Sequence, residues 1–285
     1  MECSHPNIGS GRGELQQHLE ADRFFGVLIG SVAPLLRLTS SEFAMARQPL
    51  HRRYHKGPWM VGIGLLDKRP IHAKLIGQCI TMWPEVEVTM ALLLAILMKA
   101  NSSDAAVAVY LSIRAGRPRR NALDAAAETS LSKQDYELFG AIMSVFATVE
   151  DQRNTLTHGN WGVCNELEDG VLWLHSTHYS NWLLSQIRKE PAPDANAHAE
   201  LAKRIFVYKE ADLLEIRDNI AALRTIVADF IWYLRRDLMH GGIPSDVIYL
   251  QLCSEPHIAE ALYRLRTEKN APSTPQQPGP LIGSD

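Results

Sequence analysis

The chain has 285 residues, 46% of them hydrophobic and 21% charged, which is enough for one large domain or two small ones with a packed core. Its 29 Lys and Arg nearly balance its 32 Asp and Glu, and the formal net charge of −3 excludes a histone-like polycationic protein. The four cysteines are scattered without a Cys-x-x-Cys pair, which predicts neither a disulfide framework nor a cysteine zinc site.

The two ends of the chain are predicted to lie outside the main domain. Residues 1–22 are rich in Gly, Ser and polar side chains and indicate a flexible arm. Residues 269–285 include four prolines and few apolar groups, which predicts a disordered tail. Between them we expect an extension, residues 23–80, that packs on a main domain of residues 81–268. No uncharged stretch reaches the roughly 18–20 residues of a membrane span, so we expect a cytoplasmic protein without membrane contact.

The first half of the main domain is predicted to be helical. Pro84, followed by Glu85 and Glu87, is typical of a helix start, and the apolar residues that follow carry this helix to about Lys99. The next two predicted helices cover residues 102–114, stopped by Gly116 and Pro118, and residues 122–128.

A long helix follows, and after it the period of the sequence changes. Ser132 is predicted to cap this helix and Gly159 to stop it. Residues 161–167 and 171–175 flank an Asp-Gly pair, which predicts a small β-hairpin at about 161–175. A brief strand at 205–208, a long helix from Asp212 to about Arg235 and two short helices from Ser245 and at 258–265 complete the chain. The expected fold is therefore mainly α, a helical bundle with a β-hairpin insertion after the long helix.

The segment that favours a specific chemistry is Arg153-Asn154-Thr155-Leu156-Thr157-His158, at the end of the long predicted helix. Five positions place Arg153 and His158 about 140° apart on an ideal helix, but a loosened last turn lets the two side chains converge. The same spacing recurs from Arg235 to His240, where Arg236 stands in place of the polar Asn, and we rank this second segment lower.

The first segment resembles the signature of the HEPN superfamily, R-x4-6-H, which lies on a helix of an α bundle. The acidic helix from Pro84 also resembles the first core helix of that family, and the resemblance covers about residues 80–165. It implies an HEPN-like α domain and, in the catalytic members, a metal-independent endoribonuclease. It also implies a role as a toxin or phage-defence effector, for which an antitoxin or other regulatory protein would be a partner.

The implied reaction explains the residue types. RNA carries its own nucleophile, the 2′-hydroxyl, so the protein needs only to move protons and stabilise a charged phosphorane, without a cofactor or metal. His158 would act as general base or acid, Arg153 would bind the phosphate oxygens, and Asn154 would orient either group. One histidine cannot readily serve as both base and acid in one turnover, so the resemblance favours a homodimer with paired sites.

Further residues are predicted to support this site. The basic segment of Arg114, Arg117, Arg119 and Arg120 concentrates positive charge and is the predicted RNA-binding surface. Glu87 is the candidate supporting acid. No metal site is predicted, since His175, His178 and Cys164 near the hairpin lack a typical ligand spacing.

Other interpretations of these residues remain open. Glu85 and Glu87 suit ordinary compensation of a helix dipole, and Arg153 and His158 suit a helix C-terminal cap. The alternative function is a non-catalytic HEPN-like interaction or regulatory module that binds a protein or nucleotide partner. A third interpretation is an ordinary α domain in which the spacing arises by chance.

Overall fold

The structure is a computed structural model, and it describes residues 48–53, 58–188, 200–235 and 244–270. It is mainly helical with a small antiparallel sheet, as the sequence predicts. The predicted arm 1–22 and residues 271–285 of the predicted tail lie outside the described residues. The strands are β1 (Gln48–Pro49), β2 (Trp59–Val61), β3 (Gly159–Cys164), β4 (Gly170–His175) and β5 (Ile205–Lys209). The helices are η1 (Leu50–Arg53), η2 (Leu65–Lys68), α2 (Pro70–Leu97), α3 (Ser103–Ser112), α4 (Gly116–Ser130), α5 (Lys133–Thr157), α6 (Ser176–Ile187), α8 (Glu210–Leu234), α9 (Ser245–Ser254) and α10 (Pro256–Asn270).

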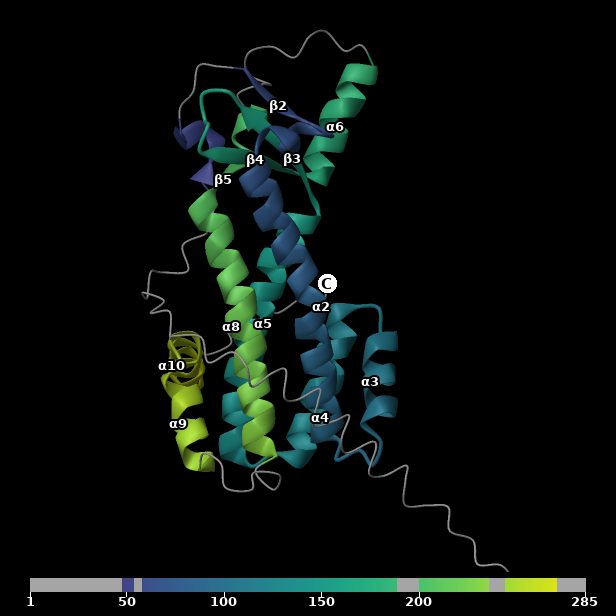
Figure 1. The fold of residues 1–285 in the computed structure, drawn as a ribbon, viewed down its shortest axis with the longest axis vertical. Helices are drawn as coiled ribbons and strands as arrows, with labels where there is room; N and C mark the ends of the chain where they lie inside the picture. Colours follow the sequence, from purple (N-terminus) through teal and green to yellow (C-terminus); the bar gives the residue numbers. More distant parts are fainter. Residues whose placement is uncertain (1–47, 54–57, 189–199, 236–243, 271–285) are drawn as a thin grey trace, which may run out of the picture. The chain divides into compact units, whose positions relative to one another are not determined.

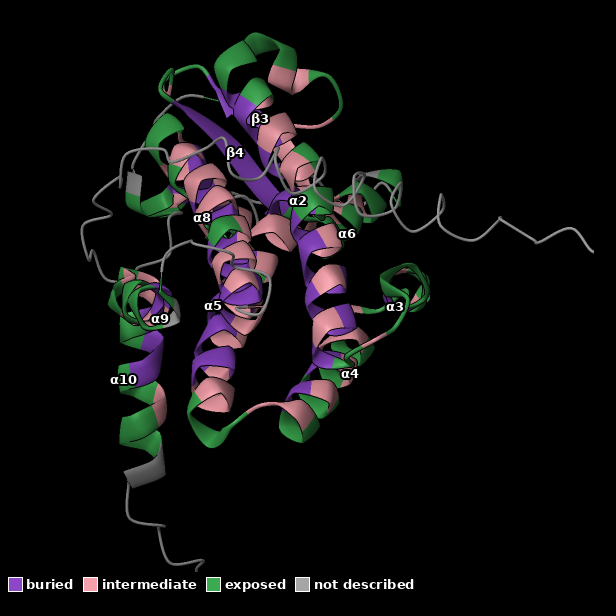
Figure 2. Cartoon of the chain, turned by 60° about the horizontal axis from the view of Figure 1, so that its bottom comes forward, coloured by how far each residue is buried: buried purple, intermediate pink, exposed green. Residues whose placement is uncertain are grey.

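Three long helices, α2, α5 and α8, form the centre of the bundle (Figure 1). Their buried faces turn toward one another, while α3 is largely exposed (Figure 2). The predicted apolar stripe of α8 is confirmed, since Leu213, Ile220, Leu223 and Val227 are fully buried. The predicted cap of α5 is also confirmed, because the Ser132 hydroxyl accepts a hydrogen bond from the Asp135 N–H at 3.2 Å.

The sheet lies at the end of the bundle where α2 and α8 begin and α5 ends (Figure 1). Its strand order is β1-β5-β4-β3-β2, with all neighbours antiparallel. The predicted hairpin and the predicted strand at 205–208 are confirmed as β3, β4 and β5. The insertion is nevertheless larger than a hairpin, because residues 48–61 add a short strand at each edge. One face, with Val171 and Trp173, joins the bundle core, and the other packs against Leu50.

The prediction that the first long helix starts at Pro84 is wrong. This helix, α2, starts at Pro70, so Pro84 lies inside it and the predicted domain boundary at residue 81 falls within one helix. The start signal was assigned to the wrong proline, since Pro70 occupies the first helical position. Pro84 removes a single backbone donor, and burial of Cys79, Trp83 and Val86 in the core compensates for that loss.

The full length of α2 changes how its hydropathy is interpreted. With 28 residues, α2 is long and apolar enough to cross a bilayer by length and composition alone. Half of its most apolar window is buried within the structure. It packs mainly against α8 and α3, so we describe it as the central helix of the bundle.

Two further element boundaries also differ from the prediction. The helix predicted over residues 102–114 does end before Gly116, since α3 ends at Ser112. Gly116 and Pro118 then lie in the first turn of α4, which begins six residues before the predicted Ala122. A proline is tolerated there because the first N–H groups of a helix have no acceptor within it. At the other end, α10 extends to Asn270 and includes the start of the predicted tail.

Candidate functional site

The end of α5 is attached to the sheet by a tryptophan. The Trp173 Nε1–H of β4 donates to the Thr155 carbonyl at 2.9 Å, and the His158 N–H, at the helix C-cap, donates to the Asn154 carbonyl at 3.1 Å. The helix ends at Thr157, just before Gly159 as predicted, and Gly159, without a positive φ, is the first residue of β3. A glycine is needed there because a Cβ would overlap the Trp173 indole ring. This contact places His158 beside the end of β4.

Arg153 lies half-buried on the bundle side of α5. Its guanidinium lies 5.7 Å from the centre of the Trp83 ring of α2, and its Nη1 donates to Asn154 Oδ1 at 3.1 Å. Its Nε is buried and has no hydrogen-bond acceptor among the described residues. A buried donor without an acceptor costs free energy, so Arg153 Nε calls for an explanation, of which a bound ligand is one.

His158 has an exposed side chain at the end of α5. Among the described residues, no hydrogen bond or ion pair joins its ring to Arg153. Neither the Arg153 side chain nor the His158 side chain caps the end of α5 among the described residues. The carbonyls of Arg153 and Asn154 instead accept from the Thr157 hydroxyl, at 3.4 and 2.9 Å, and the His158 carbonyl accepts from the Ser176 hydroxyl at 2.6 Å.

The candidate acid, Glu87, belongs to a charged network that reaches Arg153 through Trp83. Glu87 Oε1 accepts from Trp83 Nε1 at 3.2 Å and from Arg119 Nη1 at 2.8 Å. Arg119 also donates through Nε to the Ile113 carbonyl at 2.6 Å and lies 5.4 Å from the centre of the Tyr110 ring. Glu87 therefore forms an ion pair with Arg119 and is linked to Arg153 through the Trp83 side chain.

The predicted RNA-binding arginines divide into two kinds. Arg119 and Arg120 are held in ion pairs, the second with Glu150 Oε2 at 2.6 Å, and these pairs offset the unfavourable position of cations at the N-terminus of α4. Arg114 and Arg117 have exposed side chains. The segment also lies close to α5, since a Cβ on Gly116 would contact the Glu150 carboxylate, two helical turns before His158.

A second polar cluster, not predicted as a site, adjoins His158. Gly159 pairs with His175 in the sheet, and His178 lies one turn further along in α6. The His175 and His178 rings are 6.0 Å apart, and Arg204 Nη1 donates to His178 Nδ1 at 2.9 Å. Partial burial, followed by the charge of Arg204, lowers the pKa of His178. Sequence reasoning could have linked His175 to the end of α5 only through the hairpin register.

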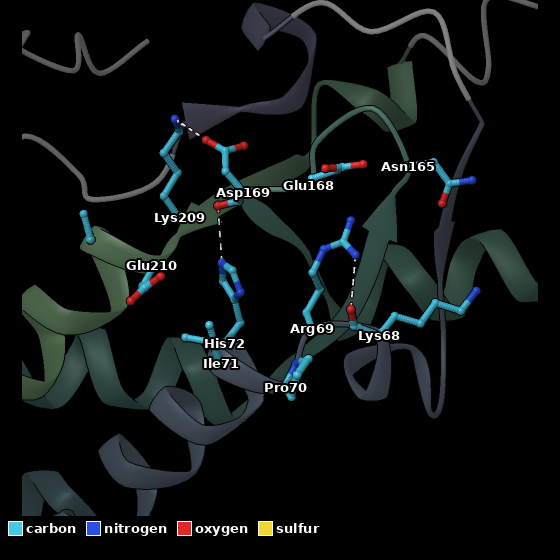
Figure 3. A pocket seen from close by; sticks show the side chains of 11 residues that line it. Lys68, Arg69, Pro70, Ile71, His72, Asn165, Glu168, Asp169, Lys209 and Glu210 are labelled. Atoms are coloured by element: carbon cyan, nitrogen blue, oxygen red, sulfur yellow. Dashed lines mark hydrogen bonds and ion pairs between the residues drawn. The ribbon is translucent and has the colours of Figure 1, made fainter.

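A pocket of about 660 Å³ lies where the β3–β4 loop meets the starts of α2 and α8 (Figure 3). Arg69 donates to the Cys164 and Leu167 carbonyls at 3.4 Å each, and the buried His72 is hydrogen-bonded to the Asp169 carbonyl. The charged lining residues are balanced in sign: Lys68, Arg69, Lys209, Glu168, Asp169 and Glu210. This balance gives no preference for an anionic ligand such as RNA.

Two of the remaining predictions concern a metal and the second motif. In the described ranges, no group of three His, Cys, Asp or Glu side chains is placed to bind a metal ion. Residues 236–240 of the second motif lie outside those ranges.

Comparison with known proteins finds no family model, no curated protein and no solved structure that matches this chain.

Proposed function

We propose that the protein is a metal-independent endoribonuclease of the HEPN type, which cleaves RNA by attack of the 2′-hydroxyl. The observation that carries the proposal is the end of α5, where an exposed His158 follows Arg153 by five residues. Neither side chain is used to cap α5 within the described structure, and Arg153 retains a buried donor without an acceptor. Both side chains therefore lack the structural partners that a simple helix cap would give them.

In the proposed reaction, His158 accepts the proton of the 2′-hydroxyl, and the 2′-oxygen attacks the phosphorus. The bond from phosphorus to the 5′-oxygen breaks, and a protonated histidine donates a proton to that oxygen. The products are a 2′,3′-cyclic phosphate and a 5′-hydroxyl. We assign the second histidine to a second copy of the chain in a homodimer, and the stabilisation of the phosphorane to Arg153.

Asn154, which accepts a hydrogen bond from Arg153, is proposed to hold the guanidinium in place. The exposed Arg114 and Arg117 are proposed to contact the RNA backbone further along α5. We also propose a cytoplasmic location, which rests on the composition of the sequence. A toxin or phage-defence role with an antitoxin or regulatory partner is proposed from the sequence resemblance.

The test is cleavage of total RNA by the purified protein in EDTA, with the RNA ends identified. We expect wild type to leave 2′,3′-cyclic phosphates and His158→Ala to lose about 100-fold or more of the rate. Arg153→Lys keeps the charge but not the planar fork, and we expect it to lose about tenfold or more.

Arg264→Ala is the matched control, because it removes an exposed arginine of α10 beside the other half of α5. Its neighbour Arg266 pairs with Glu137, which is about 30 Å along α5 from His158. The control variant should cleave like wild type. If folded wild type cleaves no RNA, the nuclease proposal is wrong and the interaction module becomes the better interpretation. If EDTA stops cleavage, the metal-independent mechanism is wrong.

A further inference from the structure

We propose that His175, His178 and Arg204 form a phosphate-binding subsite that holds the RNA phosphodiester beside His158. The inference rests on the proposed function, because it takes the RNA backbone as the ligand. It goes beyond that function in assigning a substrate-binding role to three residues outside the Arg153–His158 segment.

The hydrogen bonds of the two histidines determine which ring nitrogen is available to a ligand. His175 Nδ1 accepts the Thr177 backbone N–H at 3.2 Å. His178 Nδ1 faces Arg204 Nη1 at 2.9 Å, and since a guanidinium can only donate, this Nδ1 also accepts. A ring that accepts at Nδ1 carries its hydrogen on Nε2. Both histidines therefore present an Nε2–H donor in the neutral state.

Arg204 supplies the positive charge of the cluster. Its side chain is exposed, and no carboxylate in the described part of the chain pairs with it. By contrast, Arg119, Arg120 and Arg224 each pair with a glutamate at 2.6–2.8 Å. An arginine that donates to a neutral histidine keeps its full charge for an anion, and its planar fork suits phosphate oxygens.

The subsite lies close enough to His158 to share one phosphodiester. The register pairs Gly159 with His175, so the Cα atoms of His158 and His175 are at most about 9 Å apart. The Ser176 hydroxyl links the two elements by its bond to the His158 carbonyl, and Asn160 Nδ2 donates to that hydroxyl at 3.3 Å. The imidazoles of His158 and His175, one on each side of this gap, can therefore reach the same phosphate group.

This assignment separates the roles of the histidines. A general acid must be an imidazolium, and a general base must have a free lone pair on the nitrogen that faces the substrate. His175 and His178 present Nε2–H in the neutral form and meet neither requirement. They serve as hydrogen-bond donors, while proton transfer stays with His158.

The test measures binding of a fluorescent 2′-O-methyl RNA, which cannot be cleaved because its nucleophile is blocked. We expect Arg204→Ala to raise the Kd about tenfold, and Lys203→Ala, which removes the adjacent exposed charge, to change it less than about twofold. His175→Gln places an amide N–H near the position of Nε2 and should bind like wild type. His175→Asn, whose amide is too short, should bind several-fold more weakly.

Cleavage of ordinary RNA provides the second readout. His175→Asn should lower kcat/KM only several-fold and leave its pH dependence like that of wild type, whereas a proton-transfer role for His175 predicts a loss of at least about 100-fold. Such a loss would overturn the assignment. Unfolding temperatures of the variants should match that of wild type, since the three side chains are exposed or half-buried.

The remaining outcomes distinguish this proposal from the proposed function. Wild type that cleaves RNA, with binding unchanged in Arg204→Ala and His175→Asn, overturns the subsite alone. Wild type that neither binds nor cleaves RNA overturns both proposals. Calorimetric titration with inorganic phosphate tests a free phosphate compound as the ligand. If Arg204→Ala abolishes phosphate binding but not RNA binding, the assignment to RNA is wrong.

Discussion

Glu87 connects the N–H of the buried Trp83 with the half-buried Arg119 guanidinium. Because Arg119 is only 16% exposed, the loss of its anionic partner leaves a poorly solvated charge. We expect Glu87→Gln to lower the free energy of unfolding by about 1–2 kcal/mol, measured by urea denaturation. The matched control is Glu260→Gln. Its partner Arg264 is about half exposed and lies 3.7 Å from the carboxylate, so we expect a loss of stability below about 0.5 kcal/mol. Lost cleavage at unchanged stability would instead identify Glu87 as a catalytic acid.

Asp229, in the last two turns of α8, makes stability depend on pH. Burial raises the pKa of its carboxyl from 3.8 to about 6. The folded state therefore binds the proton more tightly than the unfolded state, so protonation of Asp229 stabilises the fold at low pH. This stabilisation is lost as the pH rises from about 4 through 6. We expect Asp229→Asn to raise the free energy of unfolding at pH 8 by about 1–2 kcal/mol, after allowance for solvent screening. At pH 3.5 the variant and wild type should be equally stable, and an equal gain at both pH values would contradict the assignment.

At the scale of single elements, the contact between Gly159 and Trp173 determines how α5 meets the sheet. A Cβ at position 159 overlaps the indole ring, so Gly159→Ala must displace Trp173 from the Thr155 carbonyl. We expect a loss of about 2–4 kcal/mol in stability, together with loss of RNA cleavage. Gly77→Ala in α2 is the matched control, because a Cβ there meets no atom within 4 Å, and it should stabilise by up to about 1 kcal/mol. Thermal unfolding of both variants checks the difference, and equal effects would contradict it.

The helices were predictable where a local signal and the apolar period agreed. Ser132 marked the start of α5 correctly, and the apolar period of α8 predicted its buried stripe. The prediction failed at two prolines, because the effect of a proline depends on its position within a helix. Pro84 and Pro118 are tolerated, one because its helix is buried and the other because it lies in a first turn. Neither circumstance can be read from the neighbouring residues.

At the scale of the whole molecule, the sheet and the site depend on contacts between distant segments. β1 and β2 have two and three residues, too few to show an alternating pattern, and they exist because β5 and β3 offer edges for pairing. Arg153 and His158 were found from their spacing together with local context, namely Asn154 and the end of a long predicted helix. The contact of Trp83 with Arg153, and that of Arg204 with His178, join segments 70 and 26 positions apart and have no local signature.

The proposed dimer predicts a dominant effect of an inactive subunit. If cleavage needs His158 from both copies, a mixed dimer with one His158→Ala chain is inactive. After free exchange in an equal mixture, only about a quarter of the dimers are fully wild type. We expect the cleavage rate of the mixture, at the same total chain concentration as undiluted wild type, to fall to about a quarter of the wild-type value. The reference is wild type diluted twofold with buffer, which should keep half the rate. A mixture that also keeps half would show that each chain cleaves alone, with its second proton-transfer group on the same chain.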